Sequence, residues 1–265
     1  MKNGLEGKNR MTAVVTALYR YPVKGLSADA LQRVVLAAGE AMPLDRAWAI
    51  ENGPSRFDPD APRHLPPASF LTLSRDERLA SLEARFAEEE SRLALLRRGR
   101  QVANGRLTER IGRQVIEQFL AAYLSASLRG PPKILSALGH TFSDIPEKRL
   151  HLINLRSVAE IERVTGREVD PLRFRPNVVI DGPATWSEAG WVGRELTVGS
   201  VRLRVTGRTP RCAAVNVDPK TGARDMAIPA TLQREWGTMD FGVYAEVVDG
   251  GPLAVGDAVT LDGGG

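Results

Sequence analysis

The sequence predicts a mainly β protein of the α+β class, with a barrel or sandwich of short strands flanked by a few helices. Short apolar segments rich in β-branched residues recur along the chain and are separated by turns that contain glycine or proline. Only three segments show apolar residues at helical spacing. Neither common glycine-rich phosphate motif occurs, which argues against a doubly wound nucleotide-binding sheet.

The bulk composition is that of an ordinary globular protein. The 265 residues are 43% hydrophobic and 26% charged, and they suffice for one large domain or two modest ones. Residues 1–10 are polar, and no apolar segment approaches the ~20 residues that span a bilayer, so we expect a cytoplasmic protein without a membrane partner.

The first half of the chain predicts strands and two helices. Strands are expected over residues 12–21, 33–37, 47–50 and 70–73, with a long loop between residues 52 and 67. Ser74 and Glu77 form a capping box, which predicts a helix over about residues 75–90. A second helix is expected after Thr108, because Ile111, Val115 and Phe119 form one apolar stripe.

The second half is dominated by predicted strands. Ser157 and Glu160 form another capping box, and Gly166 is a suitable end for the helix that follows. The Gly199-Ser200 pair is typical of a two-residue hairpin loop. Strands are expected over residues 151–153, 178–180, 196–198, 201–205, 213–217, 244–248 and 258–261. We expect two domains, residues 11–125 and residues 126–263.

The lone cysteine, Cys212, is the first candidate for chemistry. It excludes an intramolecular disulfide and any multi-cysteine zinc or iron-sulfur site built from this chain alone. Cys212 follows a basic segment, and the sequence predicts that nearby guanidinium groups favour the thiolate, a good ligand for transition metals. The alternative is a small buried hydrophobic residue. The expected cluster of cations around it comprises Arg202, Arg204, Arg208 and Arg211.

Other basic residues are candidates for anion binding. Arg175 and Asn177 lie in the segment Arg173-Phe174-Arg175-Pro176-Asn177, where guanidinium and amide groups suit phosphate oxygens and a heterocycle edge. Lys24 and Arg46 are basic residues at loop positions; for each of these side chains a solvated surface charge is the alternative. With three histidines in the chain, a histidine-rich zinc site is not expected.

Five segments together resemble the MOSC superfamily, named for the C-terminal domain of molybdenum cofactor sulfurase. They occur in the family's order over most of the chain: Tyr21-Pro22-Val23-Lys24-Gly25, Leu44-Asp45-Arg46-Ala47-Trp48, Phe142-Ser143-Asp144, Arg173-Phe174-Arg175-Pro176-Asn177, and Arg211-Cys212-Ala213 through Gly222. The resemblance implies a MOSC β-barrel with a smaller N-terminal β-rich domain. Within this superfamily, the amidoxime-reducing components are the members that this sequence resembles in expected function.

The resemblance also implies roles for individual residues. Cys212 would be the catalytic residue and the ligand of molybdenum in a molybdenum-molybdopterin cofactor. The residues expected to bind the pterin or its phosphate are Lys24, Arg46, Ser157, Arg175, Asn177 and Arg211. Pro210 stands where the amidoxime-reducing relative has a serine, which puts a hydrogen bond near the metal in doubt.

The implied function is a molybdenum-dependent oxidoreductase that reduces N-hydroxylated or N-oxygenated small molecules. The chain lacks a fused iron-sulfur domain, so electrons would come from a separate donor such as a ferredoxin or flavin reductase. An alternative is a sulfur carrier with a Cys212 persulfide, or a cofactor carrier without turnover. Nucleic-acid binding is not expected despite the net charge of +4, because aromatic residues make up only 6% and do not alternate with the arginines.

Overall fold

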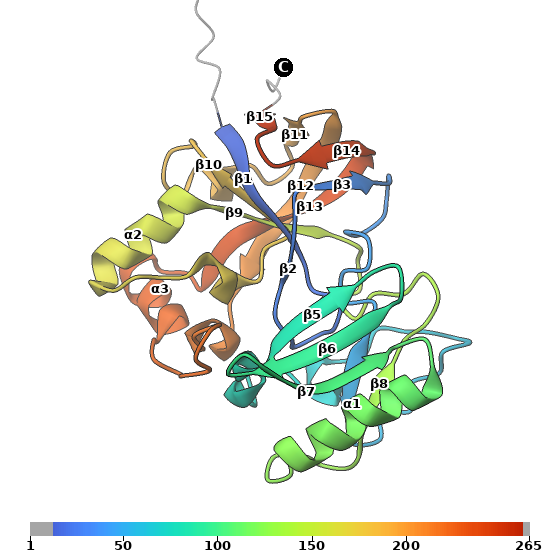
Figure 1. Cartoon of the computed structure of the whole chain (residues 1–265). Coiled ribbons are helices and arrows are strands. Elements are labelled where there is room, and N and C mark those ends of the chain that lie inside the picture. Colours follow the sequence, from blue (N-terminus) through green and yellow to red (C-terminus); the bar gives the residue numbers. More distant parts are fainter. Residues whose placement is uncertain (1–12, 262–265) are drawn as a thin grey trace, which may run out of the picture.

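The computed structural model describes residues 13–261, and it is mainly β with three α-helices among these residues (Figure 1). The expected fold class is confirmed. Residues 11, 12, 262 and 263, which the predicted strand and domain limits include, lie outside the described residues.

Seven strands close into a barrel. Following hydrogen-bonded neighbours, their order is β1 (Ala13–Arg20), β10 (Val178–Asp181), β9 (Leu150–Asn154), β13 (Asp240–Asp249), β12 (Val201–Pro210), β11 (Glu195–Val198) and β15 (Ala258–Leu261), which pairs again with β1. All of these pairs are antiparallel except β9 with β10. Closure leaves these strands without a free edge.

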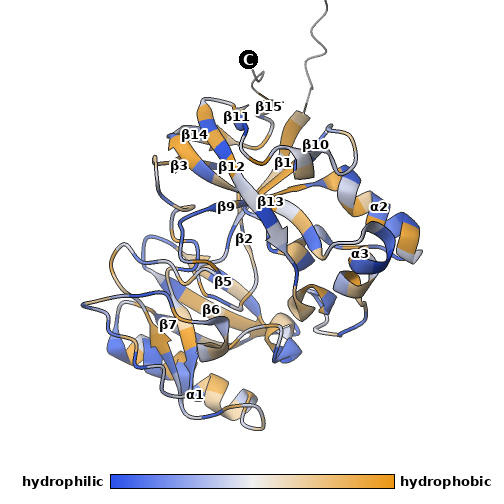
Figure 2. Cartoon of the chain, turned by 180° about the vertical axis from the view of Figure 1, so that it is seen from behind, coloured by the Kyte–Doolittle hydropathy of each residue, from blue (hydrophilic) through white to orange (hydrophobic). Residues whose placement is uncertain are grey.

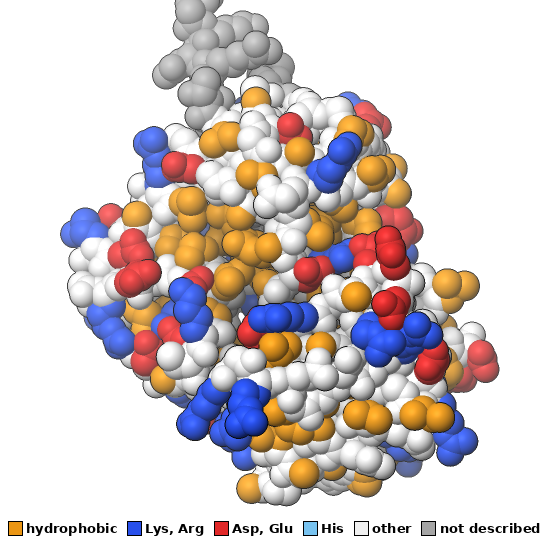
Figure 3. All heavy atoms as spheres, in the orientation of Figure 1, with side chains coloured by type: hydrophobic (Ala, Val, Ile, Leu, Met, Phe, Trp, Pro, Cys, Tyr) orange, Lys and Arg blue, Asp and Glu red, His pale blue; other side chains and the backbone are white. Residues whose placement is uncertain are grey.

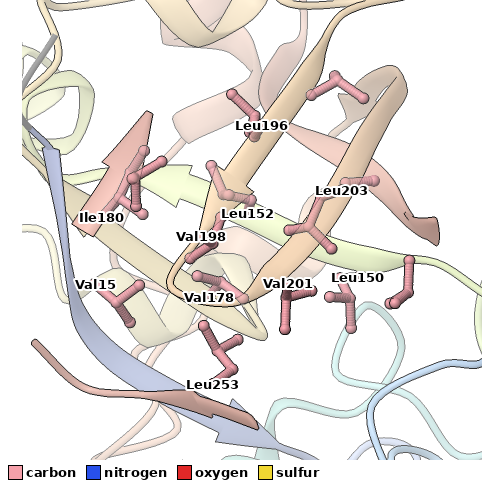
Figure 4. Close-up of a cluster of buried hydrophobic side chains, with 14 of the residues drawn as sticks. Val15, Leu150, Leu152, Val178, Ile180, Leu196, Val198, Val201, Leu203 and Leu253 are labelled. Carbon is pink, nitrogen blue, oxygen red and sulfur yellow. The ribbon is translucent and has the colours of Figure 1, made fainter. Parts of the chain in front are cut away.

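The barrel interior is an apolar core. Hydrophilic and hydrophobic residues alternate along β12, as Figure 2 shows, and the hydrophobic ones are the buried ones. Side chains from strands distant in sequence meet there, among them Val15, Leu152, Ile180, Leu203 and Leu253 (Figure 4). The barrel is therefore filled by side chains, and a binding site must lie outside this core.

Strands from the two expected domains pair with each other. Residues 13–20 of the first complete the barrel formed by the second, and β2 (Asp29–Leu31) extends it by pairing with β1. In addition, β3 (Arg33–Leu36) pairs with β14 (Gly251–Ala254). The first strand of the chain therefore belongs to the barrel, and the residues that follow form a second layer beside it.

That second layer has its own sheet, helix and core. The strands β5 (Glu83–Ala87), β6 (Arg92–Arg97) and β7 (Arg100–Arg106) form one sheet, and β4 (Ala49–Asn52) pairs with β8 (Pro132–Leu135). The helix α1 (Arg110–Tyr123) packs against β7 and β8, which confirms the helix expected after Thr108 (Figure 1).

The helix expected over residues 75–90 is wrong. A short 3-10 helix, η2 (Glu77–Ser81), is followed by β5, and Asp76 accepts the capping hydrogen bond from Arg78 N–H. Residues 83–87 alternate strictly between exposed and half-buried positions, and β5 pairs with β6 along its whole length. The alternation of exposed and half-buried residues along β5 is a strand pattern, and it determined the structure here although Leu79, Leu82 and Phe86 have helical spacing.

The third layer consists of α2 (Leu155–Thr165) and α3 (Ile228–Trp236), which pack on the outside of the barrel around a separate apolar cluster. Gly166 ends α2 in the left-handed conformation, with φ +66°, as expected. The predicted cap at Ser157 is wrong, because Asn154 accepts the hydrogen bond from Arg156 N–H and the helix begins earlier.

The remaining elements are short. Besides η2, the 3-10 helices are η1 (Pro67–Ser69), η3 (Pro171–Phe174), η4 (Ser187–Gly190) and η5 (Ala213–Asn216). The strands expected at residues 70–73 and 213–217 are wrong, since the first keeps only a bridge at Phe70 and the second is η5 followed by a bridge at Val217. The hairpin at Gly199 is confirmed, with Val198 opposite Val201 and φ +58° at the glycine.

Candidate functional site

A cavity of about 380 Å³ lies where β12 and β9 of the barrel meet loops from the second layer. Both halves of the chain line it. Lys24 follows β1 and Arg46 precedes β4, whereas Arg175, Arg211 and Cys212 follow η3 and β12. The volume is in the range of small-molecule and cofactor sites.

Cys212 is exposed and lines this cavity. It follows the end of β12 directly, because β12 stops at Pro210 and the chain turns into η5. The alternative of a buried hydrophobic cysteine is therefore wrong. The thiol is accessible to a bound group, with Arg211 as its chain neighbour.

Lys24 reaches the cavity from a buried position. Its Nζ donates a hydrogen bond of 2.8 Å to the carbonyl oxygen of Phe142 and forms an ion pair with Asp144. Burial lowers the pKa of Lys24, and the charge of Asp144 opposes this shift. Desolvation would raise the pKa of Asp144, but the charge and hydrogen bond of Lys24, together with the charges of Arg46 and Arg175, lower it by more.

Arg46 and Arg175 both contact the ring of Tyr21. Their guanidinium carbons lie 5.0 Å and 4.1 Å from the ring centroid. Arg46 is neutralised by an ion pair with the buried Asp45, which also accepts a hydrogen bond from Tyr21 N–H. Arg46 and Arg175 have φ of +52° and +53°, a conformation that costs energy for a residue with a side chain and that concentrates at functional sites.

Arg175 retains binding capacity. Its Nη1 donates a hydrogen bond of 2.7 Å to Leu26 O, but its buried Nη2 has no partner among the described residues. Burial, with a further contribution from the charge of Arg46, lowers the pKa of Arg175 to about 10. A bound anion would provide both the missing acceptor and the missing opposite charge.

Arg211 is held in place by backbone carbonyls and by His151. Its Nε donates to Phe241 O at 2.8 Å and its Nη1 to Phe174 O at 3.1 Å. Its Nη2 contacts Nε2 of His151, whose Nδ1 lies 3.3 Å from Arg175 O. Burial and the charge of Arg211 lower the pKa of His151 well below 6.5. The imidazole is therefore neutral and accepts from Arg211 while donating to Arg175 O.

This arrangement predicts a pH dependence of stability. The unfolded chain protonates His151 near pH 6.5 but the folded protein does not, so the free energy of unfolding falls as the pH drops below 6.5. The slope from this group is at most about 1.4 kcal/mol per pH unit. We expect His151→Gln to show a flatter profile than the native protein in urea unfolding between about pH 5 and 6.5. Parallel profiles would contradict a buried neutral imidazole.

Two expected binding residues have structural contacts instead. Asn177 lines the cavity, but its Oδ1 accepts from His151 N–H at 3.0 Å and its Nδ2 donates to Tyr19 O at 3.2 Å. Ser157 is not among the lining residues. It is fully buried in α2, and its Oγ accepts from Trp186 N–H at 2.9 Å.

The expected cluster of arginines around Cys212 is reduced to Arg211. Arg202 and Arg204 pair with Glu195 on the outer face of the barrel, and Arg208 donates to Ala189 O. These three residues stand at alternate positions of β12, so their side chains share the face of the strand that points away from the cavity.

Several lining residues were not assigned from the sequence. Asp45 and Asp144 lie within the motifs that carried the resemblance, so their position there was the available signal. His151 had no such signal, because its role depends on a contact with Arg211 60 residues away. Thr209 is buried, and its hydroxyl has no partner among the described residues.

The cavity fits an anionic organic group. Six cationic residues line it, against two carboxylates: Lys24, Arg46, Arg149, Arg173, Arg175 and Arg211 face Asp45 and Asp144. Arg175 Nη2 and Thr209 Oγ1 are buried polar atoms that a ligand could satisfy. Within residues 13–261 no three histidine, cysteine or acidic side chains group as metal ligands. A metal in this cavity would need ligands from a bound cofactor in addition to Cys212.

In a comparison with known proteins, the C-terminal part of the chain matches a known domain family. Residues 138–260 match the model of the MOSC domain. Human molybdenum cofactor sulfurase is 26% identical over 267 aligned positions, covering 87% of this chain and 30% of that protein. Mitochondrial amidoxime reducing component 2 of Rattus norvegicus is 31% identical over 122 positions, covering 42% of this chain and 36% of that protein. The chain thus spans about a third of the length of these relatives.

Two solved structures are similar. The YuaD protein of Bacillus subtilis has a TM-score of 0.46 at 13% identity, covering 96% of this chain and 97% of that one. YiiM of Geobacillus stearothermophilus has a TM-score of 0.35 at 16% identity, covering 43% of this chain and 54% of that one. Within residues 13–261, no helix has the length and apolar character needed to cross a membrane.

Proposed function

This chain is a MOSC-domain protein, and from that premise we propose that it binds a molybdenum-pterin cofactor and reduces N-hydroxylated small molecules. One observation carries the proposal. The exposed thiol of Cys212 shares a cavity with Lys24, Arg46, Arg175 and Arg211, which reach it from both halves of the chain.

The residues present fit such a cofactor. Cys212 would bind the metal, because a thiolate is a suitable ligand for a soft or high-valent transition metal. Arg175 would hold the phosphate, since its Nη2 has no other acceptor, and Arg211 and Lys24 would add charge. Thr209 Oγ1 would satisfy a polar atom of the pterin. Asn177 would act indirectly, by fixing the backbone of residue 151.

The proposed reaction is R–NHOH + 2 e⁻ + 2 H⁺ → R–NH₂ + H₂O. The N–O bond breaks, nitrogen is reduced, and the oxygen leaves as water. Molybdenum, when bound, supplies the oxygen-atom transfer, while the chain fixes the position of the metal and the charge around it. The single cysteine of these 265 residues cannot hold an iron-sulfur cluster, so a redox partner of the ferredoxin or flavin-reductase type would deliver the electrons.

Turnover by the molybdenum-loaded protein tests this proposal. With reduced methyl viologen as the artificial electron donor, we expect N-methylhydroxylamine to be converted to methylamine at a rate proportional to the molybdenum content. The control is the same protein without molybdenum. Protein that carries one molybdenum per chain but forms no amine would refute the reductase activity.

The exposure of Cys212 and the 87% coverage in the match to molybdenum cofactor sulfurase favour one second candidate, a sulfur carrier. In that case Cys212 would carry a persulfide without turnover of a substrate. Intact-mass measurement distinguishes the two. An extra sulfur atom that is removed by a reductant, in protein without pterin, supports the carrier and argues against the reductase.

A further inference from the structure

We propose that a second cavity, next to the Cys212 cavity, binds an uncharged aromatic or apolar group of the substrate. This cavity has a volume of about 440 Å³ and lies among β1, β2, β5 and η3. The inference rests on the proposed function only for the identity of the reacting group, which would be the N–O group. The apolar specificity follows from the cavity itself.

The two cavities adjoin each other. Five residues line both of them, namely Gly25, Leu73, Arg173, Arg175 and Ala214. A molecule that extends across this shared boundary would have one end beside Cys212 and the other end in the second cavity. The boundary includes Arg173 and Arg175, each of which has a buried donor without a partner among the described residues.

The walls of the second cavity are mainly apolar. Aromatic and aliphatic side chains come from five separate segments, and they include Tyr19, Leu26, Leu73, Phe86, Leu172 and Val217. Figure 3 shows hydrophobic side chains gathered over β1 and β2, between α2 and β5. A flat aromatic ring would be desolvated against such walls, and this transfer is favourable.

Apart from Arg175 at the boundary, the charged residues of this cavity form ion pairs. Asp29 accepts from Arg20 at 2.8 Å, and Glu83 pairs with Arg85 at 2.6 Å. Arg173 is buried and pairs with Asp225 at 2.9 Å and with Asp218 at 3.2 Å. A charged ligand group would have to compete with these ion pairs, so the cavity favours a neutral group. This separates it from the Cys212 cavity, where cations predominate.

A buried polar atom of the second cavity gives the ligand an orientation. The hydroxyl of Tyr21 and Nη2 of Arg175 are both buried and have no partner among the described residues. Tyr21 lines only the second cavity, and its ring contacts the Arg175 guanidinium. With Arg175 Nη2 bound to the proposed cofactor, a substrate with an aromatic ring and a neutral hydrogen-bonding group next to it would satisfy the hydroxyl of Tyr21.

Direct binding tests this proposal. The probes are N-benzylhydroxylamine and N-methylhydroxylamine, which differ by one phenyl ring, and affinity is measured by titration calorimetry on the molybdenum-loaded protein. We expect the benzyl compound to bind about tenfold more tightly or better. Ala84→Phe and Ala28→Phe should each remove this preference, because both residues line the second cavity from different segments. Ala87→Phe is the matched control, since Ala87 is exposed on the same strand as Ala84 and lies outside the cavity.

The outcomes separate this proposal from the proposed function. No preference in the native protein, or a preference that both cavity-filling variants retain, would overturn the apolar subsite. If the preference for the benzyl compound is lost in Ala84→Phe and Ala28→Phe but kept in Ala87→Phe, the subsite is supported. If neither compound is reduced although the binding preference holds, the reductase activity fails while the subsite stands. If both compounds are reduced, the preference should also appear in KM.

Discussion

Replacing Cys212 with alanine is expected to lower the molybdenum content of the purified protein from about one atom per chain to less than about a tenth of that. Within residues 13–261 no three histidine, cysteine or acidic side chains group as metal ligands. Loss of the thiolate therefore leaves the chain without a direct bond to the metal. Elemental analysis of the native and variant proteins, prepared in parallel, measures the effect.

Arg208→Ala is the matched control for this experiment. Arg208 is an exposed cation near the same end of β12, but it does not line the cavity and its Nε donates to Ala189 O. This variant should retain its molybdenum. Equal metal contents in Cys212→Ala and the native protein would show that the sulfur is not the ligand, and native protein without any molybdenum would remove the cofactor proposal itself.

Gly112→Ala is expected to destabilise the protein by about 3 kcal/mol or more. Gly112 lies on the buried face of α1, and a Cβ built there would lie less than 3.0 Å from backbone atoms of Arg106. Gly105 has the same relation to the backbone of Gly112. Because only backbone atoms are in contact, no rotamer change can relieve the overlap, and α1 would have to move away from β7.

Urea unfolding measures this change. Gly190→Ala serves as the control, since a Cβ at Gly190 has no heavy atom within 4 Å, and its effect should stay within about 0.5 kcal/mol. A Gly112→Ala variant as stable as the control would mean that the helix and the strand are not packed as closely as described.

Elements with strong local signals were predictable. The stripe of Ile111, Val115 and Phe119 predicted α1, and Gly166 and Gly199 marked a helix end and a hairpin, because only a glycine adopts a positive φ without strain. Predictions failed where two periodicities overlapped. Residues 75–90 have apolar residues at helical spacing, yet the exposed alternation along β5 and its pairing with β6 determined the outcome.

The candidate site was predictable in part. The motif residues Lys24, Arg46, Arg175 and Cys212 do line one cavity, although up to 188 positions separate them along the chain. The count of arginines near Cys212 was misleading, because Arg202, Arg204 and Arg208 lie on the outer face of β12. Ser157 was placed at a helix start by its spacing from Glu160, whereas Asn154 is the residue that caps α2.

The sequence by itself determined the mainly β class, the uniqueness of the thiol and the order of the basic motifs, since these depend on residue type and local spacing. Only the tertiary structure decided that β1 closes the barrel against β10 and β15, that His151 supports Arg211, and that a second, apolar cavity adjoins the first. Each of these depends on contacts between residues far apart in the chain, and local propensity carries no information about which distant side chains will meet.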